Sequence, residues 1–243
     1  MNSYIDMNRL YKNRFLLIRH GESVWNKDSK FTGWTNIPLT EKGKGEGATI
    51  AKTLIDHKLT PNIIFSSVLD RAIDTSTIVK THLGSPEMQI HTSWRLNEKH
   101  YGTLEGIPRQ YIRGTFGDKF TQLMRSDFYM KPPVIKPDIQ PGELVYPIYR
   151  NCYFDSIKNG ESKEDVLARL LPYYENDIVY TILHEHKTPL IVTHKHTARV
   201  LMKHLLNIND VDFVDYNLPS KIILMVYIDD DRSYLGHEEI KYE

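Results

Sequence analysis

Cysteine is almost missing from this sequence of 243 residues, in which only Cys152 is present. A single thiol cannot form an internal disulfide, which is typical of a protein kept in a reducing compartment. Long apolar segments are missing too. The start of the chain holds no stretch of signal-peptide length, and the longest apolar runs, 15–18 and 222–228, are far shorter than the roughly 18 to 20 residues that span a bilayer. We therefore expect a soluble cytoplasmic protein with no membrane partner.

An excess of charge of one sign is also missing, because 31 Lys and Arg residues balance 31 Asp and Glu residues. Without a net field the chain is not expected to bind nucleic acid or another polyanion. The content of apolar (40%), aromatic (11%) and charged (26%) residues excludes long disorder and is typical of a globular protein. At this length we expect one domain over residues 14–243, preceded by an N-terminal extension, 1–13.

Three short apolar runs, 15–18, 63–65 and 190–192, have the length and composition of buried strands. Each is followed by polar residues and then by a helical pattern. The first of these helices can be capped by Thr40, the second ends near Gly84, and the third covers 198–206. Because this order is that of parallel β-α units, we expect an α/β fold, a three-layer α/β/α sandwich with a mostly parallel central sheet.

The C-terminal half carries fewer but clear signals. Ser162 and Asp165 have the spacing of a capping box and predict the start of a helix, which should bend at Pro172. Residues 222–228 predict a further strand. The stretch 131–160 is rich in proline and glycine and has no period, so we expect a long loop or lid inserted into the domain around 126–160.

Cationic side chains follow the predicted strands at their carboxyl ends. Arg19 and His20 come directly after the first strand, Arg71 lies one helical turn beyond the second, and His194 ends the third. Ligands of open parallel sheets bind beyond this edge, and guanidinium groups suit bidentate contact with a phosphate. The sequence therefore predicts an anion pocket at this edge of the sheet.

Longer motifs surround these residues. They are 17–26 (LIRHGESVWN), 31–34 (FTGW), 66–75 (SSVLDRAIDT), 94–102 (WRLNEKHYG) and 168–173 (ARLLPY). In this order they resemble the motifs of the histidine phosphatase superfamily, and specifically of its cofactor-dependent phosphoglycerate mutases. The resemblance covers residues 14 to about 240. It implies a phosphoglycerate mutase-like version of the predicted α/β fold.

The resemblance also implies a mechanism. His20 would carry a phosphoryl group as a phosphohistidine, primed by the cofactor 2,3-bisphosphoglycerate. Arg19, Arg71 and His194 would stabilise the charge on the phosphoryl oxygens, and Glu98 would exchange a proton with the substrate hydroxyl. The substrate would be a small phosphorylated molecule, and no metal would be needed. Family members are commonly dimers or tetramers, so a homodimer or homotetramer is expected.

Further ligand contacts are carried over from the family motifs, position by position. They are Gly21, Glu22, Ser23, Asn26, Thr32, Gly33, Lys99, Tyr101, Arg109, Arg125, Lys195 and His196. At Arg109 the mutases have a lysine, which keeps the charge but changes the geometry.

Four further residues depart from the mutase pattern. Lys195 and His196 stand where the mutases have Gly-Asn, and Ser126 replaces the second of two paired arginines. Lys221 replaces the glycine of a Pro-Thr-Gly-Ile segment. We expect these changes to affect the placement of the acceptor more than the capture of a phosphoryl group by His20.

Three functions are therefore considered. The first is a phosphoglycerate mutase that interconverts 2- and 3-phosphoglycerate, with full or reduced activity. The second is a phosphatase acting on bisphosphoglycerate or another small phosphate ester. The third is an inactive paralogue that binds phosphorylated ligands or a protein partner without turnover.

Two other patterns carry less weight. The histidines within 184–196 lack the spacing of a zinc-binding pair on a helix, and His194 already has a role, so no metal site is expected. The glycine-rich segment 43–47 lacks the Gly-Lys-Ser or Gly-Lys-Thr of a phosphate-binding loop and predicts the start of a helix.

Overall fold

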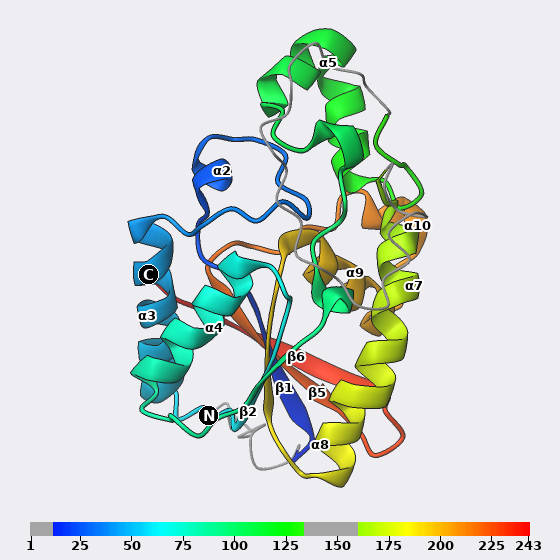
Figure 1. The fold of residues 1–243 in the computed structure, drawn as a ribbon. Helices are drawn as coiled ribbons and strands as arrows, with labels where there is room; N and C mark the ends of the chain where they lie inside the picture. The colour runs from blue at the N-terminus through cyan, green and yellow to red at the C-terminus, as the bar shows by residue number, and fades with distance from the viewer. Residues whose placement is uncertain (1–11, 134–159) are drawn as a thin grey trace, which may run out of the picture.

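A six-stranded mixed sheet forms the centre of the protein, which is described here by a computed structural model over residues 12–133 and 160–243 (Figure 1). The strand order is β3-β2-β4-β1-β5-β6. The pairings of β1 with β4, β2 with β4 and β2 with β3 are parallel, whereas β5 and β6 are antiparallel to their neighbours. The strands are β1 (Arg14–Arg19), β2 (Ile63–Ser66), β3 (Ile90–Thr92), β4 (Pro189–Thr193), β5 (Ile222–Ile228) and β6 (Tyr234–Lys241).

The α/β fold with a three-layer arrangement is confirmed, and so are the four strands predicted from apolar runs. The central strands β1, β2, β4 and β5 are almost completely buried. The sequence patterns did not predict β3 and β6, and the sheet is mixed because β5 runs antiparallel to both of its neighbours, β1 and β6. In the parallel pairings Leu17 lies opposite Ile191, and Ile64 lies opposite Leu190. Because β1, β2 and β4 run in the same direction and are aligned in this way, their carboxyl ends lie at the same edge of the sheet.

Helices cover both faces of the sheet (Figure 1). Alternate residues of β1 point to opposite faces, so Leu16 and Ile18 pack with α3 and α4, whereas Phe15 and Leu17 pack with α7 and α9. The helices are α2 (Val24–Lys27), α3 (Glu41–Asp56), α4 (Asp70–His82), α5 (Arg109–Ser126), α7 (Lys163–Tyr173), α8 (Tyr180–His184), α9 (Lys195–Leu205) and α10 (Asp210–Phe213), with 3-10 turns η1 (Trp94–Leu96) and η2 (Gly102–Leu104) and the π-helix η3 (Tyr174–Val179).

Helix α3 begins where the sequence predicts. The Thr40 side chain accepts a hydrogen bond from the Gly43 N–H, which caps the helix. The glycine-rich segment 43–47 is part of this helix, as expected. Gly43 is required by space, since a Cβ there would lie 2.1 Å from the carbonyl oxygen of Glu22. The first turn of α3 therefore packs directly on the backbone that follows β1.

Helix α7 begins with the predicted capping box, in which Ser162 and Asp165 bond to each other's backbone N–H. The helix continues past Pro172, and the backbone changes to the π-helix η3 from Tyr174. The bend at Pro172 stays a prediction, and what the structure shows is a change of helix type just beyond this residue. Helix α4 ends at His82, close to the predicted stop at Gly84.

The predicted insertion is only partly covered by the structure. Residues 127–133 follow α5, whereas 134–159 and Cys152 lie outside the described residues, as does most of the predicted extension 1–13. Helix α5 itself was not predicted, and Gly117 interrupts its helical geometry with a φ of +84°. Figure 1 shows α5 beyond the edge of the sheet at which the parallel strands end. Among the described helices, none has both the length and the apolar character to cross a bilayer.

Candidate active site

A cavity of about 380 Å³ lies at the carboxyl ends of the parallel strands. The end of β1, the start of α4, the turn after η1, helix α5 and the N-terminus of α9 all contribute to its wall. Seven cationic side chains face three carboxylates there, so the cavity is strongly electropositive although the whole chain is neutral. The cations are Arg19, Arg71, Arg109, Arg125, Lys42, Lys195 and Lys221, and the carboxylates are Glu22, Glu46 and Glu98.

His20 is buried at one end of this cavity, with 5% of its surface exposed. Its Nδ1 lies 2.6 Å from the carbonyl oxygen of Gly21, and because a carbonyl can only accept, Nδ1 carries the ring proton. The lone pair is therefore on Nε2, which accepts a hydrogen bond of 3.3 Å from Arg71 Nε. This is the nitrogen that can attack phosphorus.

The surroundings keep the His20 ring neutral. Burial lowers its pKa well below the usual 6.5, and the positive charges of Arg19 and Arg71 lower it further, against a smaller opposing effect of the hydrogen bond to Gly21. A neutral imidazole is nucleophilic, whereas a protonated one is not. The cations that would neutralise a phosphate thus also keep its acceptor reactive.

His194 lies beside His20, with ring centroids 4.8 Å apart. It is the N-cap residue of α9 and is completely buried. Within residues 12–133 and 160–243 neither ring nitrogen has a hydrogen-bond partner. Burial lowers its pKa most, followed by the charges of Arg71, His20 and Arg19. His194 can therefore donate one N–H to an oxygen held against His20.

Arg71 is fixed by backbone carbonyls. Its Nη2 donates to Gly33 O at 2.7 Å and its Nη1 to Thr35 O at 3.0 Å, which orients the guanidinium toward His20. Gly33 has a φ of +54°, and a Cβ there would lie 1.8 Å from Glu105 Oε1. Only glycine fits at this position. Since the Gly33 carbonyl accepts a hydrogen bond from Arg71, the predicted residue Gly33 helps to position that guanidinium.

Arg19 is held by the short helix α2. Its Nη2 donates to Asn26 Oδ1 at 2.8 Å, and Asn26 forms a capping box with Ser23. Thr32 lines the cavity with a buried hydroxyl that has no partner among the described residues. Arg19, Asn26 and Thr32 therefore present groups to the cavity from the segments the motifs indicated.

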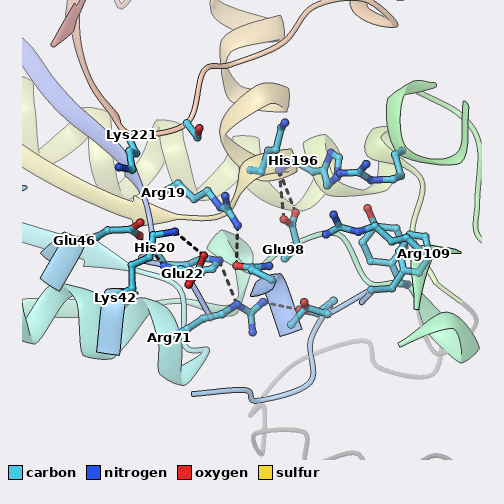
Figure 2. A pocket seen from close by; sticks show the side chains of 18 of the residues that line it. Arg19, His20, Glu22, Lys42, Glu46, Arg71, Glu98, Arg109, His196 and Lys221 are labelled. Atoms are coloured by element: carbon cyan, nitrogen blue, oxygen red, sulfur yellow. Dashed lines mark hydrogen bonds and ion pairs between the residues drawn. The ribbon is translucent and has the colours of Figure 1, made fainter. Parts of the chain in front are cut away.

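Glu98 stands between the two ends of the cavity (Figure 2). Its Oε1 accepts from the backbone N–H of Lys99 at 2.8 Å and of His196 at 3.2 Å. Its own carbonyl accepts from Trp34 Nε1 at 2.6 Å and from Arg169 Nη2 at 2.9 Å. Peptide N–H groups thus position the carboxylate, which has no salt bridge among the described residues and can accept or release a proton in the cavity.

The end of the cavity away from His20 holds a second group of cations, with Arg109 at the far side in Figure 2. Burial lowers the pKa of Lys195 to about 8, and the charges of Arg125, Arg19 and Arg199 act in the same direction. Burial and the neighbouring Arg125 also lower the pKa of Arg109. A bound anion would offset the electrostatic repulsion among these cations, so this part of the cavity suits a second anionic group of a ligand.

Four predicted residues lie outside the wall of this cavity. Gly21 packs against α3, where a Cβ would lie 2.2 Å from Gly43 O, and Ser23 caps α2. Lys99 is buried, and its Nζ donates to the carbonyls of Met124 and Met130 at the end of α5. His194 lies behind His20. Direct ligand contacts of Gly21, Ser23 and Lys99 stay predictions, and the contacts found are structural.

Other wall residues were missed, namely Phe31, Lys42, Glu46, Ser220 and Tyr242, whereas Lys221 was noticed only as a departure. Lys42 forms an ion pair of 2.8 Å with Glu22, and Glu46 accepts from the Glu22 N–H. Residues 220 and 221 precede β5, which runs antiparallel to β1. An antiparallel strand begins at the edge where its parallel neighbours end, and this signal could have placed Lys221 beside Arg19.

In the two described segments, no group of three or more His, Cys, Asp or Glu residues is arranged to hold a metal ion. His184 ends α8, and His196 lines the cavity with a backbone N–H on Glu98.

Comparisons with known proteins agree with this geometry. Residues 15–237 match the model of the histidine phosphatase superfamily (branch 1). The 2,3-bisphosphoglycerate-dependent phosphoglycerate mutase of Rhodococcus opacus (strain B4) is 36% identical over 225 residues, which cover 93% of this chain and 88% of the relative. The protein of the same name from Lachnoclostridium phytofermentans is 32% identical over 93% of this chain and 90% of its own length.

Solved structures are similar in fold at lower identity. A mycobacterial glucosyl-3-phosphoglycerate phosphatase has a TM-score of 0.72 at 20% identity, covering 95% of this chain and all of its own. A putative alpha-ribazole-5'-P phosphatase from Escherichia coli has a TM-score of 0.66 at 17% identity, covering 95% of this chain and 96% of its own. The family match and the curated relatives confirm the resemblance in the sequence motifs: the chain belongs to the histidine phosphatase superfamily.

Proposed function

We propose that the protein is a 2,3-bisphosphoglycerate-dependent phosphoglycerate mutase, which interconverts 2- and 3-phosphoglycerate through a phosphohistidine at His20. The observation that carries this proposal is the presence of two cationic ends in one cavity. Arg19 and Arg71 lie close to His20, whereas Arg109 lies on the far side of the cavity, with Arg125 as its charged neighbour (Figure 2). Lys195 has both Arg19 and Arg125 as charged neighbours. A ligand with two phosphates and a carboxylate, such as 2,3-bisphosphoglycerate, has anionic groups for both ends.

The first step places a phosphoryl group on His20. Nε2 attacks phosphorus, the Nε2–P bond forms and the P–O ester bond breaks. The leaving oxygen takes a proton from Glu98, which is held by two peptide N–H groups at the centre of the cavity. Arg71 and the N–H of His194 stabilise the charge on the transferring oxygens.

The second step depends on the acceptor. When the hydroxyl of a bound phosphoglycerate attacks phosphorus, it gives its proton to Glu98, the Nε2–P bond breaks, and the phosphoryl group is now bonded to the oxygen on a different carbon. A mutase must therefore retain its intermediate while it reorients. The cations at the far end of the cavity support this retention, because they bind the carboxylate or second phosphate during the exchange.

A phosphatase is the second candidate, and the position of the departures favours it. Lys195, His196 and Lys221 all line the cavity, so the acceptor is surrounded by side chains that differ from those of the mutases. If the intermediate escapes and water enters, the phosphohistidine is hydrolysed and phosphate is released. The third candidate, binding without turnover, needs the same cavity.

One assay separates the three. The protein is incubated with 3-phosphoglycerate, with and without 2,3-bisphosphoglycerate, and both 2-phosphoglycerate and free phosphate are measured. Isomerisation that depends on the cofactor supports the mutase, and phosphate release without isomerisation supports the phosphatase. His20→Ala should abolish either activity, whereas the exposed His57→Ala should not. Binding of 2,3-bisphosphoglycerate without any product would refute the mutase and a phosphatase that acts on these phosphoglycerates.

The small phosphorylated substrate, the cytoplasmic location and the homodimer or homotetramer also remain proposals. Light scattering of the purified protein at micromolar concentration tests the last of these. A monomer would contradict it.

A further inference from the structure

A second cavity of about 500 Å³ adjoins the active site. It lies between α5, the N-terminal part of α9 and the turn 214–217. Arg125, Lys195 and His196 line both cavities, so these three side chains form the boundary between them. The proposed reaction uses only the first cavity, and phosphoglycerate does not need the space of the second.

The second cavity differs in charge from the first. Beyond the three shared residues, two cations, Arg113 and Arg199, are balanced by two acids, Asp118 and Asp215. Arg113 is paired with Asp118 at 2.6 Å, and Arg199 donates to the backbone carbonyls of Phe213 and Tyr216. Beyond its boundary with the active site, the charges of the second cavity are therefore balanced, in contrast to the excess of cations in the first.

Apart from Val214, uncharged hydrogen-bonding groups make up the rest of the wall. They are Thr121, Gln122, Ser126, Tyr216 and Asn217. Thr121 and Ser126 donate their hydroxyl protons to α5 carbonyls, so their oxygens can still accept a hydrogen bond from a ligand. A neutral wall that offers both donors and acceptors suits a ligand with several hydroxyl groups.

A buried polar atom at the boundary is independent support. His196 is 4% exposed, and its Nδ1 has no hydrogen-bond partner within the described residues. Its backbone N–H donates to Glu98, which in the proposed reaction gives a proton to the leaving oxygen. The leaving group is thus released beside His196, at the entrance to the second cavity, where Nδ1 can receive one of its hydroxyl groups.

We propose that the second cavity binds the polyhydroxyl part of a sugar phosphate, so that the active site hydrolyses phosphate esters larger than phosphoglycerate. This rests on the proposed role of His20 as phosphoryl carrier. The P–O bond of the sugar ester breaks as the Nε2–P bond forms, and the sugar oxygen takes a proton from Glu98. Water then attacks phosphorus, the Nε2–P bond breaks, and the water returns a proton to Glu98. One ester and one water thus give one sugar and one phosphate.

The test compares long and short esters. Glucose 6-phosphate and 6-phosphogluconate are the long substrates, and 3-phosphoglycerate and glycerol 3-phosphate are the short ones. Gln122→Met and Asn217→Leu alter only the second cavity, and Gln110→Met on α5 is the control outside both cavities. Each cavity variant should lower kcat/KM for at least one long ester about five- to tenfold, as loss of a hydrogen bond requires. Short esters and the control should change less than twofold.

Three results would overturn the proposal: no phosphate release from the long esters, equal effects of the variants on long and short esters, or no effect on either. The labelling of His20 by 2,3-bisphosphoglycerate separates this failure from that of the proposed function. If His20 is labelled but long esters are inert, only the second cavity is misassigned. If long esters label His20 but phosphoglycerates neither react nor bind, the mutase proposal fails and the sugar phosphate proposal stands.

Discussion

The pH dependence of anion binding follows from Lys195. This side chain lines the active-site cavity, and burial together with the charges of Arg125 and Arg19 lowers its pKa to about 8. In the free protein about nine tenths of Lys195 is protonated at pH 7 and about one tenth at pH 9. A charged hydrogen bond to an anion contributes about 1.5 to 3 kcal/mol, or about one to two decades of affinity. Anion affinity should therefore fall about tenfold between these two pH values.

Sulfate is the probe, since its own charge does not change in this range. The inhibition constant of sulfate is measured against the phosphorylation of His20 at intervals from pH 6.5 to 9.5. Lys195→Arg should bind sulfate with an affinity that is independent of pH, because a guanidinium stays protonated. Lys195→Met should be as weak at pH 7 as the unchanged protein is at pH 9.

Lys42 provides a matched control, because it lines the same cavity but its hydrogen bond with Glu22 raises its pKa. Lys42→Arg should keep the pH dependence of the unchanged protein. Burial also lowers the pKa of Lys99 to about 8, although its Nζ bonds to backbone carbonyls outside the cavity. If Lys195→Arg retains the tenfold loss, the assignment to Lys195 is refuted and Lys99 becomes the source. A flat profile in the unchanged protein would refute the reasoning as a whole.

Three further predictions concern other parts of the structure. Glu98→Gln should lower turnover about 10²- to 10⁴-fold with sulfate affinity changed less than threefold, and normal turnover would exclude proton transfer by Glu98. Burial and the charge of Lys99 lower the pKa of Lys163 to about 6. At pH 7 Lys163 is therefore protonated in the unfolded chain, up to about pH 10, but mostly deprotonated in the folded protein, and this difference lowers the free energy of unfolding. Lys163→Met should thus raise the free energy of unfolding in urea by about 1 to 4 kcal/mol at pH 7, with a smaller gain at pH 10, and an equal gain at both would contradict this. Gly33→Ala should lower stability by about 2 kcal/mol or more and slow labelling of His20, whereas Gly45→Ala, where a Cβ contacts nothing, should leave both unimpaired.

The parts of the fold that were predicted are those whose signal is local. The runs 15–18, 63–65, 190–192 and 222–228 are buried on both faces, so their residues are apolar without interruption. Strand β6 was missed because it is a largely polar edge strand, and β3 because it has only three residues, two of them exposed. Helix α5 was missed because Gly117 breaks its geometry and few of its residues are buried.

The same distinction applies to the active site. The sequence predicted one site for Arg19, His20, Arg71 and His194, because the carboxyl ends of parallel strands lie at the same edge of a sheet. Glu98 was found only through the family motif, since it follows a 3-10 turn with no periodic signal. The missed wall residues include Lys42, Glu46 and Tyr242. The first two reach the cavity because α3 packs against the turn after β1, and Tyr242 because it follows β6. Both are contacts between segments far apart in the sequence, so no local pattern predicts them.

The contact between Gly21 and Gly43 has a consequence for how the sequence can vary. At each glycine, a side chain would collide with backbone atoms of the other segment. A smaller side chain in that segment would therefore not relieve the collision. In a library of variants at Gly21 and Gly43, we expect that no substitution at one position restores the stability lost by a substitution at the other. The spacing between the turn after β1 and α3 is therefore expected to stay fixed, and we expect adaptation to a new substrate to use other parts of the wall, such as the residues on α5 and α9.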